Sequence, residues 1–174
     1  DIFSSDMLCS LNVIRVGNRG RNVYPFYVAI KKMTAVSRYD YILHIHTKRS
    51  KHDPILGNNW LAHLMGNLMC SAHFIRNLFL MMEEKSVGLV FPEVLSLHYA
   101  SYNWRGNKML AEALAKQTDI DIEELDKPFS FPAGCMFLAK AKSLEKFASL
   151  KLDENSFPAE PIPIDGTLAH AVER

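Results

Sequence analysis

The sequence predicts an α/β domain in which helices flank a mostly parallel β-sheet, and three observations lead to that prediction. The chain has 174 residues, a length that fits one domain. Apolar residues make up 48% of it, so a sizeable core can be buried. Short β-branched segments alternate with helical segments of about ten residues or more, and this alternation is typical of parallel sheets covered by helices.

Four short segments are expected to form the strands of the sheet. They are rich in β-branched, aromatic or other apolar residues, and a glycine, a basic loop or a proline ends each of the first three. The expected strands are Leu11–Val16, Tyr41–Ile45, Val87–Phe91 and Phe131–Ala139. Gly134 lies within the last of them and predicts a tight entry, because glycine accepts backbone angles that other residues avoid.

Helices are expected between these strands. From Asn59 to Glu84 apolar residues recur at three- and four-residue steps, which predicts one long amphipathic helix or two shorter ones. Pro25 suits the first turn of a helix, and Ser143 is a candidate cap for a later one. The other expected helices cover Phe26–Ser37, Arg105–Gln117, Leu144–Ser149 and a last stretch from about Thr167, with an acidic turn or short helix at Ile120–Lys127.

Charge and cysteine content exclude several classes of protein. Lys and Arg number 20 against 19 acidic residues, so the chain has no global field that would hold nucleic acid or an anionic membrane. The 3 cysteines include no CxxC pair, which argues against a disulfide scaffold or a structural zinc site and favours a reducing compartment. No signal peptide and no apolar run of about 18 residues is present. A cytoplasmic location is expected, either free or peripheral at the inner face of the membrane.

The chain starts at Asp1 and stops inside a helix-like segment, so it is expected to be one domain of a longer protein.

Two basic loops predict a phosphate site. In open α/β sheets ligands bind outside the carboxyl ends of the strands, and both loops are expected to leave neighbouring strand ends. Their cationic side chains can pair with phosphate oxygens, and the helix after the first loop adds backbone donors. The alternative is an ordinary solvated loop in each case. The candidate diphosphate-binding residues are Asn18, Arg19, Arg21, His46, Lys48 and Arg49.

Glu160 and Asp165 are the candidate catalytic residues. They flank a Pro-rich loop, which restricts their freedom, and a carboxylate at the edge of a site can deprotonate a hydroxyl nucleophile. The alternative for Asp165 is a cap of the helix that starts near Thr167. Because one side chain does not easily serve both roles, both carboxylates remain candidates.

Three further residues are candidates for contact with a sugar. Tyr102 and Trp104 can stack on a sugar or a base ring, and Gly134 allows the backbone to approach a ligand closely.

His44 and His46 point to the same face of an expected strand, a pattern that can hold a metal. The other histidines supply no recognisable ligand set, so no metal site is expected. A buried, structural His44 is expected instead.

Five segments, in this order, resemble the rhamnan-synthesis F family of bacterial polysaccharide-assembly proteins. The HTKRS sequence at 46–50 and the DGTLAHAVER sequence at 165–174 are the specific ones. The matching segments are Asn18–Phe26, Tyr39–His52, Val87–Pro92, Phe131–Lys140 and Phe157–Arg174. The resemblance implies a role in building rhamnose-containing cell-surface polysaccharide or O-antigen.

The layout is also similar to Rossmann-like GT-A glycosyltransferases, in which the corresponding strand ends in an acidic metal-binding motif. Here that strand ends in His46-Thr47-Lys48, and these side chains repel a cation instead of recruiting one. The resemblance therefore implies a metal-independent transferase without a cofactor, in which Lys48 and Arg49 neutralise the leaving diphosphate. The expected donor is a nucleotide sugar, dTDP-rhamnose, and the expected acceptor is a polysaccharide or lipid-linked glycan. Asp165 or Glu160 would be the base, with Asp165 the first choice because its segment matches the family best.

Two other functions remain open from the sequence. The missing acidic pair also suits a non-catalytic domain of the same fold that binds glycan or nucleotide. The His44 and His46 pair alone would suit a metal hydrolase. Other domains of a longer chain are expected as partners, and nucleic acid is not.

Overall fold

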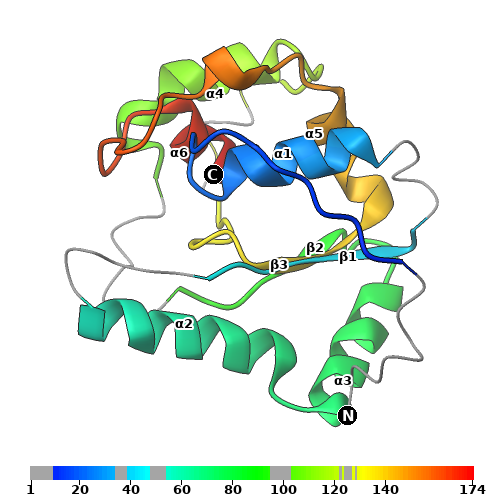
Figure 1. Cartoon of the computed structure of the whole chain (residues 1–174). Coiled ribbons are helices and arrows are strands. Elements are labelled where there is room, and N and C mark those ends of the chain that lie inside the picture. The colour runs from blue at the N-terminus through cyan, green and yellow to red at the C-terminus, as the bar shows by residue number, and fades with distance from the viewer. Residues whose placement is uncertain are drawn as a thin grey trace.

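A computed structural model of the chain describes residues 10–33, 39–47, 54–94, 103–121, 123, 127 and 129–174. A small three-stranded sheet lies between two groups of helices (Figure 1). The strands are β1 (Tyr41–His44), β2 (Leu89–Val90) and β3 (Phe137–Lys140), and β3 is in the middle. The segments expected as the second, third and fourth strands therefore all contribute to the sheet, over shorter stretches than predicted.

The predicted mostly parallel, GT-A-like sheet is wrong. Both neighbours of β3 run antiparallel to it, with Tyr41 opposite Lys140 and Leu89 opposite Ala139. Periodicity reports where strands occur along the chain, but it does not report from which edge or in which direction the chain enters the sheet. The strands have only two to four residues, and helices make up most of the regular structure. The alternation of strands and helices along the chain is therefore a weaker indication of a parallel sheet here.

The expected first strand, Leu11–Val16, is not a strand in the structure. Leu11 and Val13 are 84% and 81% exposed, so their side chains have no sheet face to pack on. The β-branched run ended by a glycine was a misleading signal there, because burial of one face is what makes a half-buried strand stable. The loop at 18–22 consequently does not leave a strand end.

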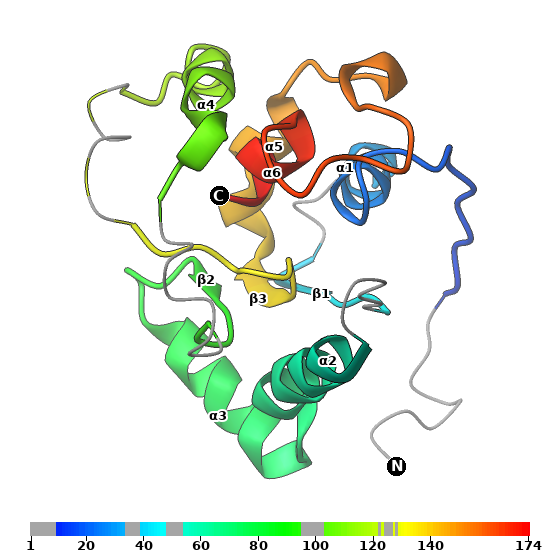
Figure 2. The ribbon, with the colours of Figure 1, turned by 90° about the vertical axis from the view of Figure 1, so that its left-hand side faces the viewer.

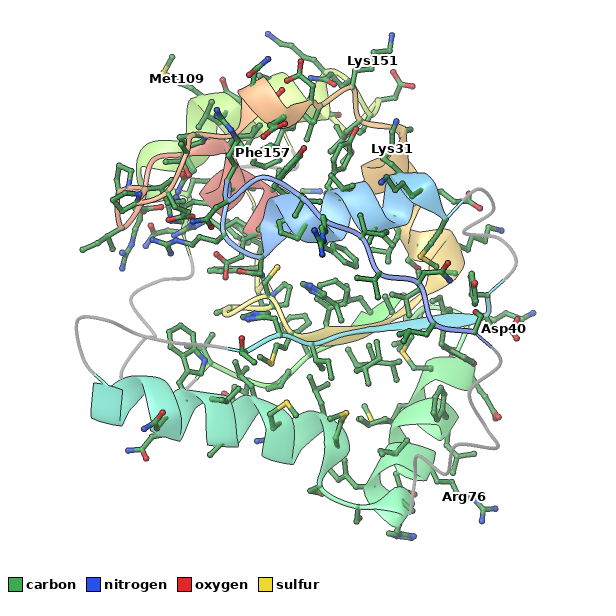
Figure 3. All side chains as sticks on the ribbon, in the orientation of Figure 1. Lys31, Asp40, Arg76, Met109, Lys151 and Phe157 are labelled. Atoms are coloured by element: carbon green, nitrogen blue, oxygen red, sulfur yellow. The ribbon has the colours of Figure 1, made fainter. Side chains whose placement is uncertain are left out.

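Four helices lie on one side of the sheet and enclose the main core (Figures 1 and 2). They are α1 (Val23–Lys32), α4 (Lys108–Ala115), α5 (Glu145–Ser149) and α6 (Leu168–Glu173). The buried residues of this core are Val23, Tyr24, Ile30, Cys135, Phe137, Ala139, Ala141, Leu144, Phe157 and Ala169. Phe157 is fully buried in this layer, as its position in Figure 3 shows, although it comes from a loop.

Two helices cover the opposite face of the sheet, α2 (Pro54–Met69) and α3 (Ala72–Glu83). They correspond to the periodic stretch expected to form one or two helices. The break occurs at Ser71, whose hydroxyl accepts a hydrogen bond from the Phe74 amide at 3.1 Å and caps α3. Leu64 and Leu68 of α2 are buried against Met136, which joins this layer to the start of β3.

The helix boundaries differ from the predicted ones where short 3₁₀ turns occur. These are η4 (Arg105–Asn107), η6 (Ala141–Leu144) and η7 (Glu154–Ser156). Because η6 leads directly into α5, the cap position of α5 is Leu144 and the predicted cap Ser143 is wrong. The expected last helix is confirmed as α6, with Thr167 at its cap position. Within the described part of the chain, no helix has the length and apolar character needed to cross a membrane.

Candidate functional site

Two loops that are far apart in the sequence lie against each other on the α1 side of the sheet. Arg19 and Ala159 form an isolated antiparallel bridge. The Glu160 amide donates to the Asn18 carbonyl at 3.1 Å, and the Gly20 amide donates to the Pro158 carbonyl at 3.3 Å. The predicted phosphate loop and the predicted catalytic loop are thus neighbours, and we call residues 18–22 together with 157–167 the loop pair.

Phe157 and Gly20 fix the shape of the loop pair. Gly20 has a backbone φ of +57°, and a Cβ atom at this position would lie 2.5 Å from the Phe157 ring. Only glycine combines this conformation with so close an approach. The buried Phe157 ring is therefore the physical link that holds the two loops at a fixed distance.

The arginines of the loop pair are already engaged with groups of the chain. The Arg19 guanidinium donates to the Phe157 carbonyl at 2.9 Å and lies 3.5 Å from the Glu154 carboxylate. The exposed Arg21 donates through its guanidinium to the Pro163 carbonyl at 3.0 Å. Lys48 and Arg49 lie outside the described residues, so the meeting of two cationic loops stays a prediction.

Glu160 serves as a tie between the two loops. One carboxylate oxygen accepts the Arg21 amide at 2.9 Å, and the other accepts the Ile162 amide at 3.1 Å. Both oxygens are thus held by backbone donors, which is the arrangement of a structural carboxylate.

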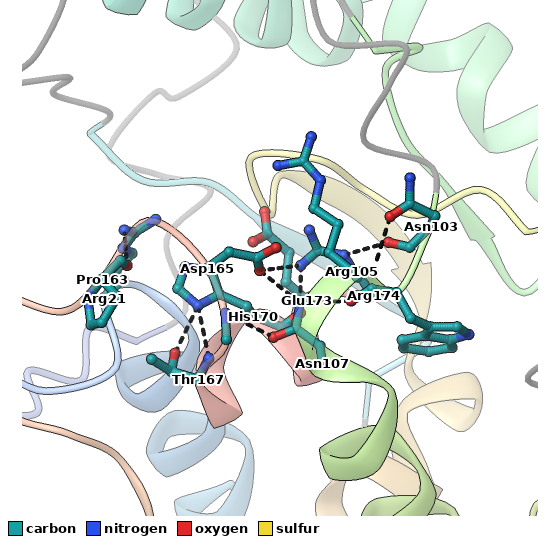
Figure 4. Close-up of polar contacts among 12 residues, drawn as sticks. Arg21, Asn103, Arg105, Asn107, Pro163, Asp165, Thr167, His170, Glu173 and Arg174 are labelled. Carbon is teal, nitrogen blue, oxygen red and sulfur yellow. Dashed lines mark hydrogen bonds and ion pairs between the residues drawn. The ribbon is translucent and has the colours of Figure 1, made fainter.

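Asp165 lies in a different environment. Its Oδ1 atom accepts a hydrogen bond from the Asn107 side chain at 2.6 Å and lies 3.3 Å from the Arg174 guanidinium (Figure 4). Asn107 is fully buried and uses its own oxygen to accept the Gly166 amide at 3.1 Å, which fixes the amide orientation. The second oxygen of Asp165, Oδ2, is buried and has no hydrogen-bond partner among the residues that the structure describes.

The surroundings of Asp165 keep its carboxyl group ionised. Burial by itself would raise the pKa, but the Asn107 hydrogen bond, the Arg174 charge and the Gly166 amide together outweigh it, and the pKa lies below its ordinary value. Asp165 is therefore a carboxylate at neutral pH, with one oxygen held in place and the other without a partner in the described structure.

The alternative role of Asp165 as a helix cap is wrong, because the cap of α6 is Thr167. The Thr167 hydroxyl and the His170 ring form the reciprocal contacts of a capping box. The Thr167 amide donates to His170 Nδ1 at 3.3 Å, and the Thr167 Oγ1 atom lies 2.8 Å from the same nitrogen. His170, which is only 3% exposed, was not predicted as a site residue.

His46 and Gly134, two predicted site residues, contact each other. His46 Nε2 donates to the Gly134 carbonyl at 2.7 Å, and the Gly134 amide donates to the Glu173 carboxylate at 2.8 Å. Gly134 has a φ of +89°, and a Cβ atom there would lie 2.9 Å from Leu64. This series of contacts links the end of β1 to α6 and helps to place the helix that carries His170.

His44 and His46, the two histidines of the HxH pattern, contact other groups of the chain. Their ring centroids are 5.8 Å apart, and the ring of His44 stacks on Phe26 at 4.1 Å. Burial, together with the neighbouring His46, lowers the pKa of His44 to about 4. Among the described residues there is also no group of three His, Cys, Asp or Glu side chains that could hold a metal.

Trp104, a predicted sugar contact, borders a cavity of about 340 Å³ between α4, α5 and α6. Its ring packs on Phe129, with centroids 4.5 Å apart. Arg174 lines the same cavity while its guanidinium holds Asp165, so cavity and carboxylate share one side chain. Tyr102, the other predicted aromatic contact, lies outside the described residues.

The site residues that sequence reasoning missed are Asn107, His170 and Arg174. A Thr-x-x-His spacing at the start of a helix is a weak sign of a capping box, and Arg174 follows His170 by one helical turn. Nothing in the local sequence distinguishes Asn107 from an ordinary polar residue.

Comparison with known proteins gives a consistent result. A family model described as Rhamnan synthesis protein F matches residues 3–174. The uncharacterized protein WxcX of Xanthomonas campestris pv. campestris strain B100 is 29% identical over 157 residues, which is 90% of this chain. The same protein from strain ATCC 33913 matches equally, and the chain covers 22% of the length of these relatives. No solved structure gives a significant match.

Proposed function

Because the chain belongs to the rhamnan synthesis protein F family, we propose that it transfers a sugar from a nucleotide sugar to a growing cell-surface polysaccharide. The observation that carries the proposal is the state of Asp165. One of its oxygens is held by Asn107 and Arg174, and the other has no partner among the described residues. An ionised carboxylate held in this way suits the base that transfer to a hydroxyl group requires.

The proposed reaction is a single displacement at the anomeric carbon of the donor sugar. The acceptor oxygen forms a bond to that carbon while the bond to the diphosphate oxygen breaks. The acceptor proton moves to Asp165 Oδ2, and the nucleoside diphosphate leaves with the bonding electrons. The proposed donor is dTDP-rhamnose, and the proposed acceptor is a polysaccharide or lipid-linked glycan.

The cations around the loop pair would stabilise the negative charge of the leaving diphosphate. Arg21 is the best placed of the described ones, since its exposed guanidinium is held only by the neutral Pro163 carbonyl. Lys48 and Arg49 follow His46 in the sequence and are proposed to approach the same diphosphate. In this proposal no divalent metal is needed, because side chains supply the positive charge.

A non-catalytic domain that binds glycan or nucleotide is the second candidate function. It is favoured by the burial of Asp165 Oδ2, because a buried oxygen in a well-packed cluster can serve structure alone. Under this alternative the Asp165 cluster would fix the loop pair, and binding without turnover would be its signature.

Calorimetry and turnover assays on the complete protein separate these functions. A panel of nucleotide sugars is titrated with and without EDTA, and release of nucleoside diphosphate is followed in the presence of a rhamnose-containing glycan. We expect selective binding of one donor that EDTA leaves unchanged, and release of nucleoside diphosphate that depends on the glycan. A strict need for magnesium or manganese would rule out the metal-independent mechanism. Donor binding without turnover under all conditions would favour the binding domain.

A further inference from the structure

His170 is a buried side chain with an unused hydrogen-bonding atom. The residue is 3% exposed, and its Nε2 atom has no hydrogen-bond partner in the part of the chain that the structure describes. Buried polar atoms are nearly always paired, because leaving one unpaired costs about 1–3 kcal/mol. An unpaired atom of this kind, beside a candidate catalytic carboxylate, points to a ligand.

The tautomer of His170 follows from its contact with Thr167. The Thr167 amide is a donor only, so the His170 Nδ1 atom that faces it at 3.3 Å must be the acceptor. Burial, and secondly the charge of Arg21, lower the pKa of the ring to about 4, so the ring is neutral near pH 7. A neutral ring with an unprotonated Nδ1 carries its proton on Nε2. The unused atom is therefore an N–H donor.

The atom that complements this donor is also nearby. Asp165 and His170 are close enough for each to shift the pKa of the other, and Figure 4 shows the two side chains next to each other. Asp165 Oδ2 is an acceptor without a partner among the described residues, as His170 Nε2 is a donor without one. No hydrogen bond joins these two atoms directly in the described structure, so one group that accepts from His170 Nε2 and donates to Asp165 Oδ2 would satisfy both.

We propose that His170 Nε2 and Asp165 Oδ2 together bind one hydroxyl group of the glycan acceptor. A hydroxyl group is the simplest ligand that donates to one atom and accepts from the other at the same time. In this arrangement it donates its proton to Asp165 Oδ2 and accepts from the His170 N–H, and its second lone pair remains for attack on the donor sugar. The inference rests on the proposed function and assigns His170 as a binding residue of that site.

The charges around the pair favour a neutral polyol over an anion or a cation. The guanidinium groups of Arg21 and Arg174 and the carboxylates of Asp165 and Glu160 are all close enough to shift the pKa of His170. A phosphate would be repelled by Asp165, which is ionised. A cation would meet the two guanidinium groups and an N–H that points toward it. A sugar hydroxyl meets neither penalty.

Binding of methyl α-L-rhamnoside and its single-deoxy analogues to the complete protein tests the inference. The variants are His170→Gln, which keeps an N–H donor near the Nε2 position, and His170→Phe, which keeps the size of the ring but no donor. Thr167→Val is the matched control, because it weakens the capping contact without touching Nε2. Melting temperatures of all variants report on folding.

We expect His170→Phe to bind the glycoside roughly ten- to a hundredfold more weakly, as loss of a buried hydrogen bond predicts, and His170→Gln and Thr167→Val to stay within about threefold of wild type. One deoxy analogue should bind to wild type as weakly as the parent glycoside binds to His170→Phe.

Equal binding by wild type and His170→Phe, or no binding of the glycoside at all, would overturn the inference and leave an ordered water as the bound group. Turnover of a nucleotide sugar that persists in that case would still support the proposed function. Hydroxyl-specific binding without turnover would support the inference and reject the transferase.

Discussion

Glu160 and Asp165 lie five residues apart in one loop, yet the structure gives them different environments. Both oxygens of Glu160 accept backbone amides, from Arg21 and from Ile162. Asp165 is held by two side chains through one oxygen only, and its other oxygen is unpaired among the described residues. The two carboxylates are both candidates from the sequence, with Asp165 the first choice, and they differ in which oxygens have hydrogen-bond partners.

The comparison teaches that partners determine what a carboxylate can do. Backbone amides that satisfy both oxygens make Glu160 a structural link between loops. An amide and a guanidinium that hold one oxygen make Asp165 an oriented and ionised group. Four substitutions test this difference between the two carboxylates, beginning with the one expected to destabilise the fold most.

Phe157→Ala should weaken the contact between the two loops of the loop pair, which contains both Glu160 and Asp165. The ring is fully buried between Gly20 and the main core, so its loss should reduce the free energy of unfolding by about 3–5 kcal/mol. Denaturant unfolding measures the change. The matched control is Phe79→Ala on α3, where the ring is 37% exposed and the loss should be clearly smaller. Equal losses would mean that the ring does not hold the loop pair.

Asn107→Ala should change the environment of Asp165 and leave the environment of Glu160 unchanged. It removes hydrogen bonds to Asp165, to the Gly166 amide and to the Trp104 carbonyl, and should cost about 1–3 kcal/mol of unfolding free energy. The pKa of Asp165 should rise, because the Asn107 hydrogen bond helps to lower it. NMR titration of the carboxyl group and denaturant unfolding give the two results. An unchanged pKa of Asp165 would contradict the proposed holding role of Asn107.

Acid should destabilise the protein through His170. The ordinary pKa of 6.5 applies in the unfolded chain and a pKa of about 4 in the fold, so the unfolded chain binds the proton first. Stability is therefore retained above pH 6.5 and falls between pH 6.5 and 4. His170→Gln should reduce this dependence by about 1–2 kcal/mol, as thermal unfolding at several pH values can measure.

His44 has the same lowered pKa, so His44→Gln is the matched comparison and should reduce the slope in a similar way. Unchanged pH dependence in His170→Gln would mean that His170 titrates normally.

Glu160→Gln should have the smallest effect. The amide side chain keeps one acceptor for the Arg21 and Ile162 amides and loses the other, which should cost about 1 kcal/mol of unfolding free energy. Because backbone amides hold both oxygens, we expect sugar transfer to remain near the wild-type rate. Loss of transfer with unchanged stability would reverse the roles of the two carboxylates.

Local sequence signals select candidate site residues, but they did not predict the direction of the strands. Glu160 and Asp165 are candidates because a Pro-rich loop and a helix start surround them, and their catalytic role stays a prediction. His46 and Gly134 are also candidates from the sequence. They contact each other across 88 positions, and this contact links two elements of the fold. The antiparallel sheet could not be predicted, since strand direction depends on the path of the whole chain.

Asn107 and His170 show why the rest of the site was missed. Their importance comes from contacts with Asp165 and Thr167 in the folded chain, and from burial that no short motif reports. The distinction between Glu160 and Asp165 has the same origin. It depends on whether each oxygen meets a donor, and those donors come from residues up to 139 positions away.

The sharpest test of the difference between the two carboxylates is the rate of sugar transfer by Asp165→Asn and Glu160→Gln, measured side by side in the complete protein. Asparagine preserves the size of Asp165 and removes the base, so transfer should fall by roughly 100- to 10,000-fold while donor binding and melting temperature change little. Glu160→Gln should retain transfer. Equal rates in the two variants, or loss of transfer in Asp165→Asn that follows loss of the fold, would contradict the account.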